Sequence, residues 1–129
     1  MHVETVNSTE TAQTIQLGKL RAEAEHANKV VASFFADPIA LQQHEQFLTH
    51  QYYAYYDKFR NQVRIISKTE ENWVIHCDVE TIYGCYRAAY AIKERLPITL
   101  SEKEVKLSRA AEFLRSWVSE CEKHLGHTV

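Results

Sequence analysis

The sequence predicts an all-α fold, an antiparallel bundle of about four helices. Two observations support this prediction. Only three glycines and two prolines occur among the 129 residues, so residues that interrupt helices are scarce. Apolar residues also recur at steps of three and four over most of the chain, which is the spacing that gives an α-helix one apolar face. An α+β fold with a β-hairpin near residues 62–82 is the alternative.

The first helix is predicted to start near Ser8 or Thr9 and to end near Ala36. Residues 1–8 are polar and show no periodic pattern, so we expect a flexible N-terminal tail followed by a single helical domain over residues 9–129. The apolar face of the first helix consists of residues three and four apart, namely Leu17, Leu20, Ala24, Ala27, Val31 and Phe34.

The dipeptide Asp37-Pro38 is the strongest local signal of an element boundary. Aspartate accepts hydrogen bonds from the first N–H groups of a helix, and proline suits the first helical position. A second helix of roughly 30 residues is therefore predicted from Pro38 to about Ser67, antiparallel to the first. Its stripe consists of Leu41, His44 or Glu45, Leu48, Tyr52, Tyr55, Phe59, Val63 and Ile66.

Residues 62–82 fit two structures. Their β-branched residues, on both sides of a polar stretch at residues 67–72, support a hairpin. One helical period accounts for residues 72–94, and Ser67 and Glu70 have the spacing of a capping box, so a third helix is the preferred interpretation. Gly84 within it indicates a close approach of another helix.

Pro97 separates the third helix from the last one, which has the clearest start and stop signals. Ser101 and Glu104 form a capping-box pattern, and Gly126 suits the C-cap. The apolar face consists of Leu107, Ala110, Ala111, Leu114, Trp117, Val118, Cys121 and Leu125.

Composition limits the classes of function. The net charge is −2 with histidine neutral, which is too balanced to indicate extensive nucleic-acid binding or an anionic membrane surface. Cys77, Cys85 and Cys121 show no paired spacing, and we find neither a signal-peptide pattern nor a long apolar run. We therefore expect a cytoplasmic protein with buried, reduced thiols and no membrane span.

All seven tyrosines lie in two short stretches of the chain. Tyrosine combines a large apolar ring with a hydroxyl group, which suits it to protein interfaces. The alternative is that about half of these rings line the interior of the bundle. The predicted protein-binding surface consists of Tyr52, Tyr53, Tyr55, Tyr56, Phe59, Tyr83, Tyr86 and Tyr90.

The sequence contains no recognised pattern of catalytic chemistry. It has no glycine-rich phosphate loop and no GxSxG motif. Glu23 and His26 have the Glu-x-x-His spacing of carboxylate-bridged di-iron bundles, but the second copy that such a centre needs is missing. We therefore expect no enzymatic activity, no catalytic residue, no cofactor and no bound metal.

These observations favour a non-catalytic protein-binding regulator: an inhibitor, anti-activator or adaptor that sequesters a protein partner through an aromatic helical surface. Long helices in a short chain leave apolar surface that one subunit cannot cover, which predicts a homodimer. One alternative is a metal- or small-ligand-binding bundle that uses His26, His76 and neighbouring carboxylates. Another is a nucleic-acid-associated protein that uses Arg60, Arg64 and Lys68, which the near-neutral charge disfavours.

Overall fold

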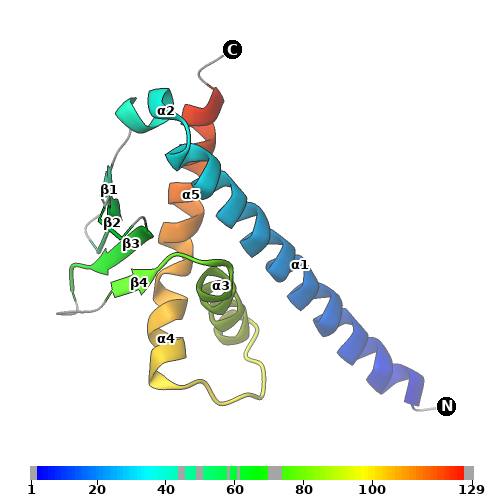
Figure 1. Ribbon diagram of the computed structural model, residues 1–129. Helices are drawn as coiled ribbons and strands as arrows, with labels where there is room; N and C mark the ends of the chain where they lie inside the picture. The colour runs from blue at the N-terminus through cyan, green and yellow to red at the C-terminus, as the bar shows by residue number, and fades with distance from the viewer. Residues whose placement is uncertain are drawn as a thin grey trace.

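A computed structural model describes residues 3–43, 46–48, 51–57, 59–60, 62–69 and 74–126, without the side chains of residues 3–11, 41, 43, 46–48, 56, 62 and 63. Most of the described chain is helical, and its strands form one small antiparallel sheet (Figure 1). In chain order the elements are α1 (Val3–Phe35), α2 (Pro38–Gln43), β1 (Gln46–Leu48), β2 (Tyr52–Asp57), β3 (Gln62–Ser67), β4 (Val74–His76), α3 (Val79–Lys93), α4 (Glu102–Arg109) and α5 (Ala111–Leu125).

The prediction of a mainly helical chain is confirmed, but the purely all-α fold is wrong. The long second helix predicted from Pro38 ends at Gln43, and the chain continues as β1, β2 and β3. The third helix begins at Val79, because Asp78 Oδ1 accepts a hydrogen bond from Thr81 N at 2.7 Å and caps α3 there. The alternative with strands within residues 62–82 is therefore the correct one for β3 and β4.

The physical reason for the error lies in the tyrosine-rich segment. Tyr52 and Ala54 of β2 are buried, whereas Tyr53 and Tyr55 are only half-buried. Burial therefore alternates with the period of two that defines a strand, and aromatic and β-branched residues favour strands. The helical prediction for this segment placed only Tyr52 and Tyr55 on its apolar face, so it did not account for the burial of Ala54.

The sheet has the strand order β1-β2-β3-β4, and all three neighbouring pairs are antiparallel. The register places Tyr53 opposite Ile66 and Tyr55 opposite Arg64, and Arg64 is in turn opposite His76. Because side chains alternate between the two faces of a sheet, these five residues share one face.

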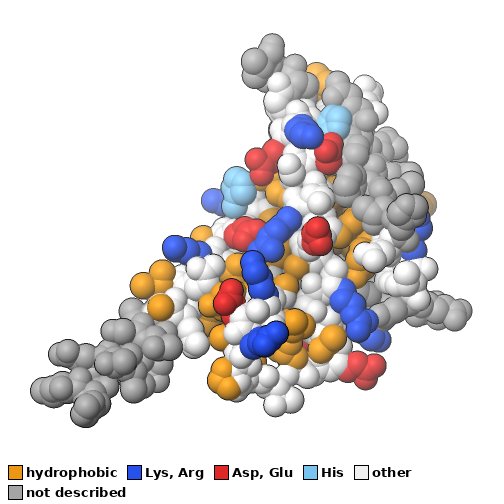
Figure 2. Space-filling model, turned by 180° about the vertical axis from the view of Figure 1, so that it is seen from behind, with side chains coloured by type: hydrophobic (Ala, Val, Ile, Leu, Met, Phe, Trp, Pro, Cys, Tyr) orange, Lys and Arg blue, Asp and Glu red, His pale blue; other side chains and the backbone are white. Residues whose placement is uncertain are grey.

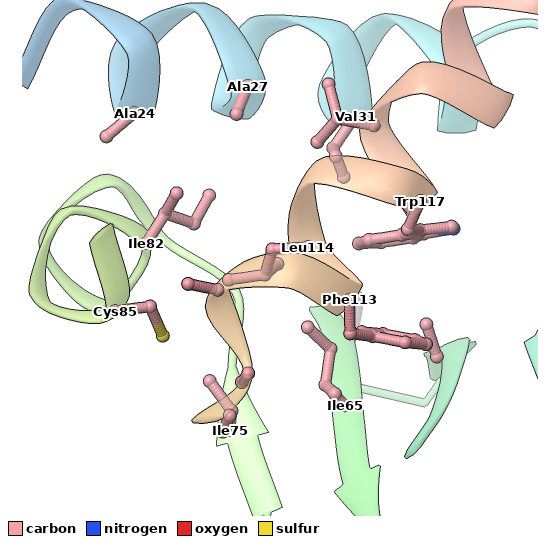
Figure 3. Packing of buried hydrophobic residues seen from close by; sticks show 14 of the residues in the cluster. Ala24, Ala27, Val31, Ile65, Ile75, Ile82, Cys85, Phe113, Leu114 and Trp117 are labelled. Atoms are coloured by element: carbon pink, nitrogen blue, oxygen red, sulfur yellow. The ribbon is translucent and has the colours of Figure 1, made fainter. Parts of the chain in front are cut away.

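Helix α5 lies between α1 and the sheet, and the core extends on both sides of it (Figures 1 and 3). On one side, Leu114 of α5 belongs to the same cluster of buried residues as Ala24 and Ala27 of α1. On the other side, Phe113 faces the strands, and its ring centroid is 5.2 Å from that of Tyr52. Helix α5 thus contributes to the packing of both the helical layer and the sheet.

Several boundaries predicted from capping residues are confirmed. Asp37 Oδ1 accepts hydrogen bonds from the first backbone N–H groups of α2, Ser101 and Glu104 form the capping box of α4, and Gly126 is the C-cap of α5. Two details differ: α1 begins at Val3 rather than near Ser8, and the last helix is divided at Ala110 into α4 and α5.

Helix α4 approaches α3 closely at Gly84, as the sequence indicated. A Cβ atom at Gly84 would lie 3.4 Å from Leu107 Cδ1. None of the helices in the described part of the chain is long and apolar enough to cross a membrane.

Replacing Leu114 with alanine should destabilise the protein by about 2–5 kcal/mol, because the fully buried side chain would leave a cavity in the core. Urea denaturation followed by circular dichroism measures this loss. The matched control is Ser116→Ala on the exposed side of α5, which should change the free energy of unfolding by less than about 0.5 kcal/mol. Equal effects of the two substitutions would contradict the central place of α5.

Candidate functional site

One face of the sheet packs against α5, and in the described part of the chain no helix covers the other (Figure 1). We call this uncovered side the outer face. Five of its described residues are half-buried, His76 is exposed, and Asp57 at the end of β2 is buried. By strand alternation and register the described side chains of the outer face are those of Tyr53, Tyr55, Asp57, Arg64, Ile66, Val74 and His76.

A stacked pair of tyrosines is the main feature of the outer face. The ring centroids of Tyr53 and Tyr55 are 5.3 Å apart, and their planes differ by only 11°. Arg64 Nη1 donates a hydrogen bond to Tyr55 Oη at 3.0 Å from the neighbouring strand. A phenolic hydroxyl that accepts one hydrogen bond keeps its own proton for donation, so Tyr55 offers a donor to a ligand.

Asp57 at the end of β2 shapes the adjacent turn. Its Oδ1 accepts hydrogen bonds from Phe59 N at 3.0 Å and Arg60 N at 3.2 Å, the arrangement by which aspartate stabilises a turn. Its Oδ2 accepts from Arg60 Nη1 at 2.7 Å and lies 3.5 Å from Arg64 Nη1. The hydrogen bond from Arg60 lowers the pKa of the Asp57 carboxyl, and burial only partly opposes this. The carboxylate is therefore charged at neutral pH.

The same turn leaves Phe59 fully in water. Its exposed fraction is 102%, so the ring contributes no burial to the fold. An exposed aromatic ring beside other exposed apolar groups is typical of a binding surface. Phe59 thus extends the aromatic surface beyond the end of β2.

The structure divides the eight predicted binding residues among several places. Tyr53, Tyr55 and Phe59 lie on or next to the outer face. Tyr52 is buried on the inner face, against Phe113. The backbone of Tyr56 belongs to β2, but its side chain lies outside those that the structure describes.

The tyrosines of α3 belong to a different part of the molecule. Tyr86 is buried, with the Arg115 guanidinium 4.5 Å from its ring centroid. Tyr83 and Tyr90 are half-buried, and the Arg21 guanidinium lies 5.4 Å from the Tyr83 ring. A single aromatic helical surface is therefore not formed, because Tyr52 to Tyr56 belong to a strand on the other side of α5.

A hollow of about 310 Å³ lies between α1, α3 and α5. Its rim carries two links between α1 and α5: Arg115 Nε donates to Glu23 Oε2 at 2.8 Å, and His26 Nε2 lies 3.3 Å from Glu122 Oε1. The Glu-x-x-His spacing thus places these two side chains in contacts between helices. Within the described residues, no group of three or more His, Cys, Asp or Glu is placed to hold a metal ion.

The three cysteines are free thiols. Burial raises the pKa of each thiol to about 12. Since a thiolate is the reactive form of cysteine, these protonated groups at neutral pH are suited to packing rather than to nucleophilic chemistry.

Sequence reasoning named Phe59 as a binding residue but placed it within a helix, and it missed the role of Asp57 in the turn. A signal was present, because Asp57 and Asn61 enclose a short, mainly charged stretch between two runs of aromatic and β-branched residues. Such a stretch is typical of a hairpin turn.

Comparisons with protein-family models, with curated proteins and with solved structures give no match for this chain. Its function is therefore inferred from the geometry of the site.

Asp57→Asn should make the free energy of unfolding less dependent on pH in the acidic range. Asparagine keeps the hydrogen-bond acceptor of the turn but removes the charge. A lowered pKa in the folded state means that the charged carboxylate stabilises the fold above its unfolded pKa of about 3.9, and that this contribution is lost as pH falls through the lower folded value. Urea unfolding at neutral pH and below the unfolded pKa should show a smaller difference in the variant than in the wild type.

The matched control is Glu112→Gln, which removes one exposed carboxylate from α5. If this control and Asp57→Asn changed the pH dependence equally, the assignment of a special role to Asp57 would be wrong.

Proposed function

We propose that this chain is a non-catalytic protein-binding regulator, which sequesters a protein partner as an inhibitor, anti-activator or adaptor. The observation that carries the proposal is the stacked pair Tyr53–Tyr55 on a sheet face that no described helix covers. We infer that the partner docks on this outer face and on the adjacent Phe59.

The composition of the outer face supports protein binding. A solvent-facing side of an antiparallel sheet usually carries polar residues, but this one also carries two tyrosines together with Ile66 and Val74. Aromatic residues and arginine are enriched among the residues that dominate binding energy at protein interfaces. The inner face of the same strands is anchored in the core, so the binding groups lie on a rigid support.

The alternatives have less support. His26 contacts Glu122 between α1 and α5, whereas His76 lies on the outer face, so the two do not form one ligand site. The net charge of the whole chain is −2 with histidine neutral, which disfavours nucleic-acid binding through Arg60, Arg64 and Lys68. The free thiols fit the reducing cytoplasm, and a cytoplasmic location is part of this proposal.

We also propose that the protein forms a homodimer. Large apolar side chains are exposed away from the outer face, including Ile15 of α1 and Ile92 of α3, and the N-terminal end of α1 extends past the other elements (Figure 1). Sedimentation velocity should give a mass of twice 15.0 kDa, and Ile15→Glu should shift the distribution toward the monomer. A monomer at all concentrations would contradict this part of the proposal.

Phe59→Ala should weaken partner binding without affecting the fold. Because the ring is fully exposed, the free energy of unfolding should change by less than about 0.5 kcal/mol. Capture of the partner from a lysate of the source cells should fall by roughly tenfold or more, as for a residue that dominates an interface. Quantitative mass spectrometry of the captured proteins measures this, and Tyr53→Ala should have the same effect.

The control for this experiment is Ile98→Ala, which removes an exposed apolar side chain from the segment between α3 and α4. If Phe59→Ala and Tyr53→Ala recovered the same proteins as the wild type and as this control, the outer face would not be the binding surface.

A further inference from the structure

We infer that the segment of the partner bound by the outer face is acidic, rich in aspartate and glutamate. This inference rests on the proposed function, protein binding by the outer face, and it adds the chemistry of the bound segment. It follows from an uneven distribution of charge, from the hydrogen-bond donors that remain available, and from the geometry of the tyrosine pair.

The β2–β3 hairpin is basic in a protein that is otherwise acidic. Residues 51–69 contain four basic residues and one acidic residue, a formal charge of +3, which leaves −5 for the rest of the chain. The helical side seen in Figure 2 carries basic and acidic side chains intermingled, with hydrophobic side chains between them. A local field of one sign directs a partner of the opposite sign to that place.

The one acidic residue of the hairpin does not cancel this charge. Asp57 is buried and contacts both Arg60 and Arg64, so one carboxylate is shared by two guanidinium groups. The side chain of Arg60 remains 60% exposed, and among the described residues only one of its guanidinium N–H groups is used. Arg60 can therefore bind a second carboxylate, and a guanidinium group does so through two parallel hydrogen bonds.

The tyrosine pair adds a donor to this surface. Tyr55 Oη accepts its hydrogen bond from Arg64, so the hydroxyl keeps a proton that it can donate to an acceptor on a bound ligand. Carboxylate oxygens are acceptors only, and they match both the phenol and the guanidinium groups. A side chain of glutamate or aspartate satisfies the donors that the outer face presents.

The same pair argues against single-stranded nucleic acid as the ligand. Proteins that bind unpaired bases on a sheet stack them on free aromatic faces. Here Tyr53 and Tyr55 are stacked on each other, so each ring covers one face of its neighbour. The pair therefore offers fewer free faces to bases than two separate rings would, whereas the donors for a carboxylate remain.

A defined probe tests the charge preference directly: a fluorescein-labelled oligoglutamate peptide, compared with an oligoserine peptide of equal length. Fluorescence anisotropy should show binding of the glutamate peptide alone, with an affinity that decreases as salt increases. Arg60→Gln/Lys68→Gln should weaken it roughly tenfold, because each exposed charge contact contributes a factor of a few.

The matched control is Lys19→Gln/Lys29→Gln, which removes the same charge from exposed positions of α1. It should leave the affinity for the glutamate peptide unchanged. Equal weakening in both double variants would overturn the inference, because the effect would then depend on total charge rather than on the hairpin. Thermal melting of each variant verifies that the fold is retained.

A second experiment separates this inference from the proposed function. The photo-crosslinker p-benzoylphenylalanine replaces Phe59, and the partner segment that it captures in the lysate is sequenced by mass spectrometry. An acidic captured segment supports the inference. A neutral or basic segment would overturn the inference and leave protein binding intact. If no protein is captured, or if the hairpin variant instead loses tight binding to a single-stranded oligonucleotide, both proposals are wrong.

Discussion

The structure depends on the wide apolar face of α5, which has to be covered from two sides. Leu114 and Trp117 pack with α1, where the Trp117 ring lies against Phe35, while Phe113 meets Tyr52 of the sheet. One helix of 15 residues thus supplies the surface against which both the long α1 and the sheet are buried. Hydrophobic burial is the dominant favourable term in folding, and α5 contributes buried side chains to the packing against both the helices and the sheet.

The candidate site follows from that arrangement. The inner face of the sheet is fixed because Tyr52, Ile65 and Ile75 are part of the core. The alternation of side chains then places Tyr53 and Tyr55 outside, with no choice of face left to them. A binding surface on such a support loses little conformational entropy when a partner docks, and Asp57 fixes the turn that presents Phe59 beside it.

The charged groups of the helices and those of the hairpin differ in how far they are paired. Besides the apolar packing, ion pairs such as Arg21–Glu80 and Arg115–Glu23 link α1 to α3 and α5, so these basic groups are each matched by an acidic one. The hairpin has more basic than acidic groups, so its formal charge is not balanced within the hairpin. Surface ion pairs contribute little to stability, but an unbalanced patch has a large effect on which partner approaches and how fast.

Residue patterns alone were enough to predict several capped helix ends, the apolar faces of α1 and α5, and the residue types of the candidate surface. Asp37, Ser101 and Gly126 act through contacts within a few residues, so local chemistry suffices to place them. The fold as a whole was needed to show that residues 52–57 form a strand and which of their rings face outward. Tyrosine and alanine at these positions fit a helical stripe as well as a strand. The strand is stabilised because β1 and β3 pair with it and because the apolar face of α5 covers its inner side. The two strands are its neighbours in the chain, but α5 lies far away in sequence, so the sequence pattern of residues 52–57 does not reveal this packing.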